Sequence, residues 1–130
     1  IDEATMKLFE EIVSIERQTS REKGEFSLFA LFLREESPDK WDLIVSAPWI
    51  EADKEGSLRY LASLVQSRLT PSGLLSLSKI VLIDVDNPAL EAVQNTVAVE
   101  HGKVEVRDSN YFGLPIKQAY IITSKRRVKV

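Results

Sequence analysis

The chain has 130 residues, 44% of them hydrophobic and 28% charged, with 17 basic against 20 acidic side chains and one histidine. This composition predicts a single globular domain over residues 1–130 with enough apolar residues for a core. Having no cysteine excludes disulfides, thiolate nucleophiles and cysteine-ligated metal centres, and no apolar run approaches the roughly eighteen residues of a transmembrane helix.

The first predicted element is an amphipathic helix over residues 4–23, followed by Gly24, which is suited to end it. Its apolar residues recur every three or four positions, at Leu8, Phe9, Ile12, Val13 and Ile15. The pattern assigns the opposite, polar face to Glu10, Glu11, Ser14, Glu16 and Arg17. A secretory leader needs an unbroken apolar stretch instead, so we expect a cytoplasmic protein.

Two strands joined by a charged turn follow this helix. Residues 26–34 are apolar on both alternating faces, which is typical of a strand inside a sheet with cover on both sides. The connection through residues 35–40 is short, so we expect residues 41–47 to pair with the first strand as an antiparallel hairpin. Residues 48–51 then leave the sheet in a loop.

A second helix and a third strand come next along the chain. The helix is predicted over residues 57–69, and turn residues at 70–73 end it. Its apolar stripe consists of Leu58, Leu61, Ala62, Val65 and Leu69. Residues 79–86 contain a continuous β-branched run that is typical of a central strand.

A third helix is predicted over residues 88–100, with Asn87 as its N-cap and Pro88 at its first position. It buries Leu90, Val93 and Val97. Strands over residues 103–107 and 119–124 complete the order α-β-β-α-β-α-β-β. This order predicts an α/β or mixed α+β fold, with five or six strands in one mixed sheet and three helices. If the helices covered only one face, the other face would need a second copy of the chain, which predicts a homodimer.

Two carboxylates follow the predicted central strand. Asp84 and Asp86 are two residues apart, so in an extended chain they point to the same side. Such a pair is a candidate Mg²⁺ site if Asp42, Glu105 or Asp108 completes it. The alternative is structural, with Asp86 capping the next helix and Asp84 at the rim of the sheet.

The histidine offers weaker support for catalysis. His101 lies at the predicted end of the third helix, where the helix dipole favours a protonated ring and disfavours a general base. We therefore interpret His101 as a surface residue, and we assign no catalytic residue.

Basic residues gather in a short tail over residues 125–130, with Lys125, Arg126, Arg127 and Lys129. Such a tail contacts nucleic-acid phosphates or simply keeps a terminal strand soluble. Three aromatic residues, Trp49, Tyr111 and Phe112, fall outside the predicted elements. They either bind a ligand or partner, together with Arg126 and Arg127, or close the ends of the core.

Taken together, these features favour a non-catalytic domain that self-associates or binds a protein partner. The alternative is a metal-dependent enzyme that acts on a nucleic-acid or other phosphate-containing substrate through Asp84 and Asp86. A third hypothesis is a small-molecule pocket that Trp49 and Tyr111 share.

Overall fold

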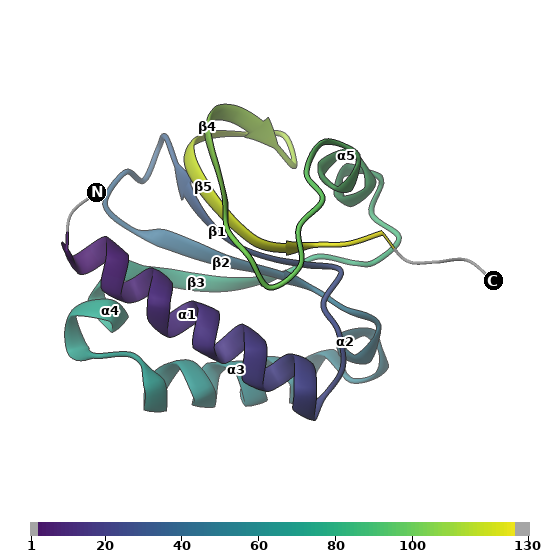
Figure 1. Cartoon of the computed structure of the whole chain (residues 1–130), viewed down its shortest axis with the longest axis horizontal. Helices are drawn as coiled ribbons and strands as arrows, with labels where there is room; N and C mark the ends of the chain where they lie inside the picture. Colours follow the sequence, from purple (N-terminus) through teal and green to yellow (C-terminus); the bar gives the residue numbers. More distant parts are fainter. Residues whose placement is uncertain (1–2, 127–130) are drawn as a thin grey trace.

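A single mixed sheet organises the computed structural model, which describes residues 3–126 (Figure 1). Its strands, in the spatial order β3-β2-β1-β5-β4, are β1 (Leu28–Arg34), β2 (Trp41–Ser46), β3 (Leu77–Leu82), β4 (Val104–Tyr111) and β5 (Leu114–Ser124). Strands β2 and β3 run parallel and the other neighbours antiparallel. The predicted fold class and the hairpin of the first two strands are therefore confirmed.

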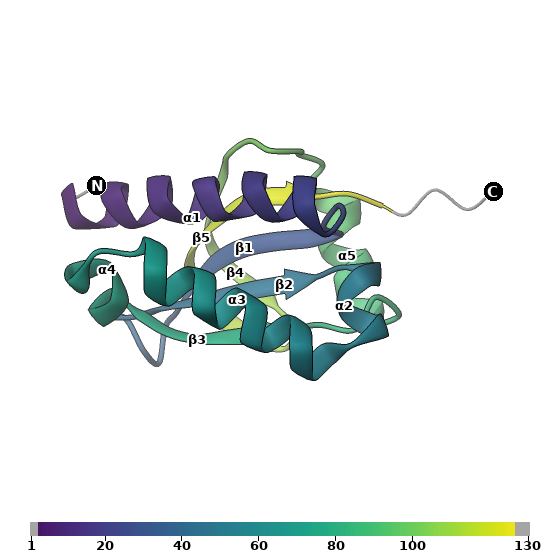
Figure 2. The ribbon, with the colours of Figure 1, turned by 90° about the horizontal axis from the view of Figure 1, so that it is seen from below.

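Helices pack on both faces of this sheet. They are α1 (Glu3–Glu22), α2 (Pro48–Ala52), α3 (Lys54–Arg68), α4 (Pro71–Ser76) and α5 (Pro88–Thr96). Figure 1 and Figure 2 show α1, α3 and α4 on one face and α5 on the other. In the described part of the chain, no helix combines the length and the apolar character needed to cross a membrane.

The sheet divides the interior into two apolar cores. Alternate residues of β1 enter each core, with Phe29 and Leu31 facing α1 and α3, and Leu28 and Phe32 facing α5. All residues of β1 before Arg34 are buried, as is the whole of β2. The predicted burial of the first strand on both sides is confirmed, and burying each large apolar side chain contributes about 1.5–3 kcal/mol.

Strand β3 was expected at the centre of the sheet but lies at its edge. It pairs only with β2, and its residues are partly or fully exposed. A continuous apolar run indicates that both faces of a strand are covered. It does not indicate whether the strand has a hydrogen-bonded neighbour on each side, which is what makes a strand central. Residues 83–86, which we expected in the strand, lie beyond its end.

Two short helices replace an expected loop and an expected turn. Pro48 and Pro71 occupy the first turns of α2 and α4, where proline is favourable because its missing N–H would have no partner there. The Thr70 hydroxyl caps α4 by accepting a hydrogen bond from the Gly73 amide at 3.2 Å. In α3, Leu58 from the expected apolar stripe is exposed.

The last strands are longer than predicted. Residues expected in a loop extend both strands, so that only Phe112 and Gly113 remain as the turn between β4 and β5. Both have positive φ angles, of 55° and 74°, which suit the right-handed twist of a two-residue hairpin. Tyr111 therefore belongs to a strand.

Helix α5 is shorter than predicted. Asn87 caps it as expected by accepting a hydrogen bond from the Ala89 amide at 2.8 Å, and Leu90, Val93 and Val97 are buried. The helix ends at Thr96, because the β-branched residues that follow are extended and Val99 forms a bridge with Ser124. His101 consequently lies in a loop over residues 97–103, outside the helix.

Candidate functional site

Strands β2, β3 and β5 have their carboxyl ends at the same end of the sheet. Leu28, at the start of β1, pairs with Ser46 at the end of β2 and with Ser124 at the end of β5. Strand β3 ends on the same side, because it is parallel to β2. Ligands of open α/β sheets bind outside the carboxyl ends of strands, so this end of the sheet is the first candidate for a binding site.

Adjoining hollows surround these strand ends. The first, of about 340 Å³, lies between α5 and the sheet and shares Ser27 and Arg126 with a second, of about 490 Å³, whose wall includes Trp49. A third, of about 430 Å³, includes Gln94 and Lys125. We call this region the strand-end surface and define it by Ser27, Trp49, Gln94, Lys125 and Arg126.

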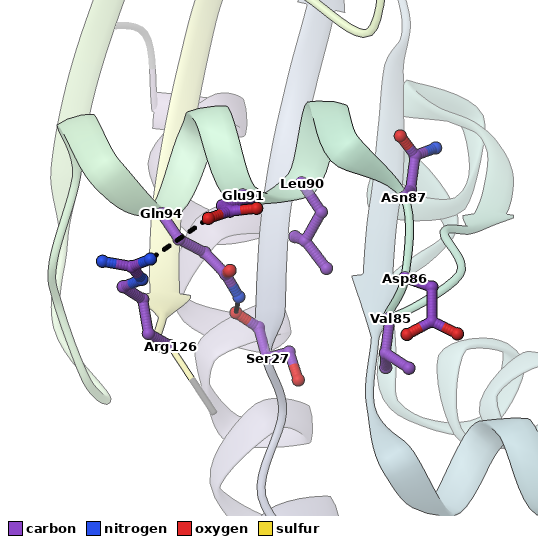
Figure 3. A pocket seen from close by; sticks show the side chains of 8 residues that line it. All are labelled: Ser27, Val85, Asp86, Asn87, Leu90, Glu91, Gln94 and Arg126. Atoms are coloured by element: carbon purple, nitrogen blue, oxygen red, sulfur yellow. Dashed lines mark hydrogen bonds and ion pairs between the residues drawn. The ribbon is translucent and has the colours of Figure 1, made fainter. Parts of the chain in front are cut away.

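Hydrogen bonds hold the first hollow together (Figure 3). The Gln94 amide donates to the carbonyl oxygens of Ser27 at 3.2 Å and Lys125 at 3.0 Å, which ties α5 to the residue before β1 and to the residue after β5. Arg126 donates to Glu91 at 3.2 Å. Asp86 lines the side of the hollow across from Arg126. The lining therefore carries charges of both signs.

The carboxylates considered for the metal site do not gather into one group. Lys54 donates to Asp84 at 2.6 Å, and this hydrogen bond and charge raise the pKa of Lys54. Asp42 lies at the other end of its strand, where Arg34 donates to it at 2.7 Å, and Glu105 binds Arg107. Among the described residues, no three histidine or carboxylate side chains are grouped so that they could hold a metal ion.

Trp49 lies in the wall of the second hollow. Its ring packs edge-on against Phe26 and Tyr60 and covers Gly24. The indole Nε1 is buried and has no hydrogen-bond partner within residues 3–126. A buried donor without a partner costs about 1–3 kcal/mol, so the packing of the Trp49 ring is stabilising enough to bear this loss.

The other expected binding residues are divided between two places. Tyr111 and Phe112 pack against Phe32 in the core under α5, whereas Trp49 packs against the core on the opposite face of the sheet. The structure therefore does not bring Tyr111 and Trp49 into one pocket. Arg126 belongs to the strand-end surface, and Arg127 lies outside the described residues.

The described part of the basic tail is paired with acids. Lys125 donates to Glu25 at 3.0 Å and to Glu100 at 3.3 Å, and the two carboxylates raise its pKa. Arg126 is held by Glu91. These pairs reduce the positive charge that the two residues offer to a phosphate backbone.

A pair that we did not expect lies beside this surface. Glu16 is 0% exposed, and both its carboxyl oxygens lie 2.8 Å from His101 Nδ1. The hydroxyls of Ser20 and Thr123 also donate to Glu16, at 3.0 and 3.1 Å. A fourth hollow, of about 300 Å³, lies at His101 between Arg17 and Arg21, and its lining shares Glu25 with the second hollow.

Two assignments made from the sequence explain why the pair of Glu16 and His101 was not predicted. We placed Glu16 on the polar face of the first helix, but it lies four residues after Ile12 and eight after Leu8, on the buried face. We placed His101 at a helix end, whereas it occupies a loop with φ of 51°. The spacing from Leu8 and Ile12 was the available signal. A carboxyl group on Nδ1 fixes the ring and leaves Nε2 for a ligand.

Comparison with known proteins adds no functional assignment. No protein-family model matches the chain, and neither a curated protein nor a solved structure matches it.

Proposed function

We propose that this chain is a non-catalytic protein-interaction domain that binds an extended polypeptide segment along the strand-end surface. The observation that carries the proposal is the run of hollows, which share lining residues from one to the next. A small-molecule site is usually one concavity that encloses most of its ligand. A row of adjoining hollows instead suits an extended polypeptide, whose successive side chains can occupy successive hollows.

The chemistry of this surface suits a peptide. The Trp49 side chain lines the second hollow and offers a large aromatic surface to a peptide side chain. The first hollow carries the Arg126–Glu91 pair on one side and Asp86 on the other, so its lining offers charges of both signs to a peptide. Tryptophan and arginine are also enriched among the residues that dominate protein–protein binding energies.

A different protein is a better-supported partner than a second copy. A homodimer was expected if helices covered one face only, and this structure has helices on both faces. The outer strand β4 also carries Glu105, Arg107 and Asp108, and charged residues at an edge discourage pairing between copies. Self-association therefore stays a prediction with less support than binding to a partner.

The remaining expectations also stay predictions. Mg²⁺ binding at Asp84 and Asp86, and action on nucleic acid, gain no support from the pairing of Asp84 with Lys54 or from the pairing of Lys125 and Arg126 with acids. The cytoplasmic location rests on the sequence pattern alone.

Selection from short random peptides displayed on phage tests the proposal. We expect enriched peptides whose affinity falls at least about fivefold in Arg126→Glu or Asp86→Lys, because each change reverses a charge in the first hollow. Arg107→Glu, a charge reversal on exposed β4, is the matched control and should leave the affinity unchanged. Failure to enrich any peptide, or equal losses in all three variants, would contradict the proposal.

A further inference from the structure

We propose that the fourth hollow, between α1 and the loop over residues 97–103, binds a phosphoryl group. Its lining consists of Arg17, Ser20, Arg21, Glu25 and His101. Two guanidinium groups and an imidazole thus lie around one small concavity, with the Glu25 carboxylate at its rim. This binding site is independent of the peptide-binding function proposed above, because it requires neither Trp49 nor Arg126.

Two arginines supply positive charge with few partners of their own. Arg17 and Arg21 lie one turn apart on α1, a spacing at which like charges repel and an anion between them is stabilising. Arg17 Nη2 donates to the carbonyl oxygen of His101 at 3.5 Å and forms no ion pair among residues 3–126. Arg21 forms no ion pair within the described residues. Guanidinium groups bind phosphate through paired N–H donors, so both are suited to this ligand.

The histidine is positioned before any ligand arrives. Glu16 engages Nδ1, and Ser20 and Thr123 hold the carboxyl group of Glu16 in place. The Thr123 hydroxyl also accepts a hydrogen bond from the His101 amide at 3.1 Å. With ring and backbone both fixed, Nε2 is the ring nitrogen that a ligand can reach, and little side-chain entropy is lost when it binds.

Two acids near the hollow oppose an anion and are themselves partly neutralised. Glu100 Oε1 lies 3.7 Å from His101 Nε2, and Glu25 belongs to the lining. Lys125 Nζ binds both carboxylates, at 3.3 and 3.0 Å. Glu100 is therefore a competitor for the same ring nitrogen, so its removal should strengthen phosphate binding.

A purely structural explanation covers only part of this arrangement. Basic residues near the end of a helix interact favourably with its dipole, which accounts for Arg21 in the last turn of α1. It does not account for a fully buried glutamate that orients a half-exposed histidine toward the same arginines. The two explanations predict different results, because only a phosphate-binding site would be saturated by an oxyanion.

The test is a titration of the ¹⁵N-labelled chain with inorganic phosphate, followed by amide chemical shifts at constant ionic strength. We expect saturable shifts at residues 17–21 and 100–102, and weaker binding of acetate, which tests whether any carboxylate would serve as well. Arg21→Gln should weaken phosphate binding about tenfold, through loss of a charge-assisted hydrogen bond. Glu100→Gln should strengthen it.

Arg59→Gln is the matched control, because Arg59 is an exposed arginine of α3 that pairs with Glu55 away from the hollow. It should bind phosphate as the parent does. Because Arg21 and Glu100 are exposed, their variants are expected to fold, and their amide spectra without phosphate will show this. Shifts that do not saturate, equal affinity for acetate, or equal weakening by Arg59→Gln would overturn the proposal.

Discussion

At the scale of single residues, the least expected feature is a carboxyl group in an apolar stripe. Glu16 follows Leu8 and Ile12 on the buried face of α1 and is completely enclosed. Enclosing such a group is costly unless donors surround it, and here one histidine and two hydroxyls do so. The network also fastens the loop of His101 to α1, so it links local packing to the geometry of the proposed phosphate site.

Replacement of Glu16 should reveal this network in the stability of the fold. Glu16→Gln keeps the shape of the side chain but turns an amide NH₂ toward groups that already donate. We therefore expect the free energy of unfolding to fall by about 1–3 kcal/mol. Chemical denaturation followed by tryptophan fluorescence measures the change. Glu10→Gln, at an exposed position of the same helix, is the control and should change stability little. Equal effects at the two positions would contradict the network's role.

A second residue-scale prediction concerns pH. The Tyr60 hydroxyl donates to Glu22 Oε2 at 2.6 Å, and this bond, helped by the Gln18 amide, lowers the pKa of Glu22. A carboxyl group with a lowered pKa stabilises the fold above its ordinary pKa, and this stabilisation is lost as the pH falls through the lowered value. Tyr60→Phe should therefore raise the Glu22 pKa toward its ordinary value.

Carboxyl ¹³C resonances measured across a pH titration give the Glu22 pKa directly. The difference in unfolding free energy between Tyr60→Phe and the parent should shrink in acid, where Glu22 is protonated in both. An unchanged Glu22 pKa in the variant would show that the hydrogen bond does not control it.

At the scale of elements, the spacing of apolar residues correctly predicted the helices and strands whose buried residues recur at regular intervals. The first helix, the doubly buried β1 and the capped start of α5 all followed from residue spacing and local cap chemistry. The edge position of β3 did not, because strand order is set by which elements meet after the crossover through α2, α3 and α4. The end of α5 was missed because Val97 is extended and Val99 pairs with Ser124 of β5 instead of continuing the helix.

Two glycines provide a comparison at this scale. Gly24 has φ of 132°, and a Cβ there would lie 3.2 Å from Trp49 Cδ1, whereas Gly113 has φ of 74° and open space. We expect Gly113→Ala to cost about 1 kcal/mol for the backbone alone and Gly24→Ala to cost more, because Trp49 must also move. Thermal unfolding of both variants measures the difference. A smaller loss in Gly24→Ala would contradict close packing of Trp49 on α1's end.

At the scale of the whole molecule, the candidate site depends on residues far apart in the chain. Trp49, Asp86 and Arg126 were singled out from the sequence, and the structure brings them to one end of the sheet. Glu16 and His101 are 85 positions apart, so their pairing follows only from the packing of α1 against the end of β5. Spacing along a chain identifies faces of elements, and it cannot identify partners that the topology brings together.

The oligomeric state is a second property of the whole molecule. Helices pack on both faces of the sheet, so the condition under which we expected a second copy, cover on one face only, is not met. Sedimentation velocity at micromolar concentration should show one species with the mass of a single chain. A stable dimer at the same concentration would restore self-association as the leading function.

Peptide binding at the strand-end surface is tested most directly by a map of the contacts that a selected peptide makes. Adding the peptide to the ¹⁵N-labelled chain should shift the amides of residues 24–27, 46–49, 86–94 and 124–126, which surround the strand-end surface. Amides of the turn over residues 35–40, at the other end of β1 and β2, should stay unchanged. If the largest shifts lie at that turn or along the outer strand β4, the peptide binds elsewhere and the strand-end surface is not the binding site.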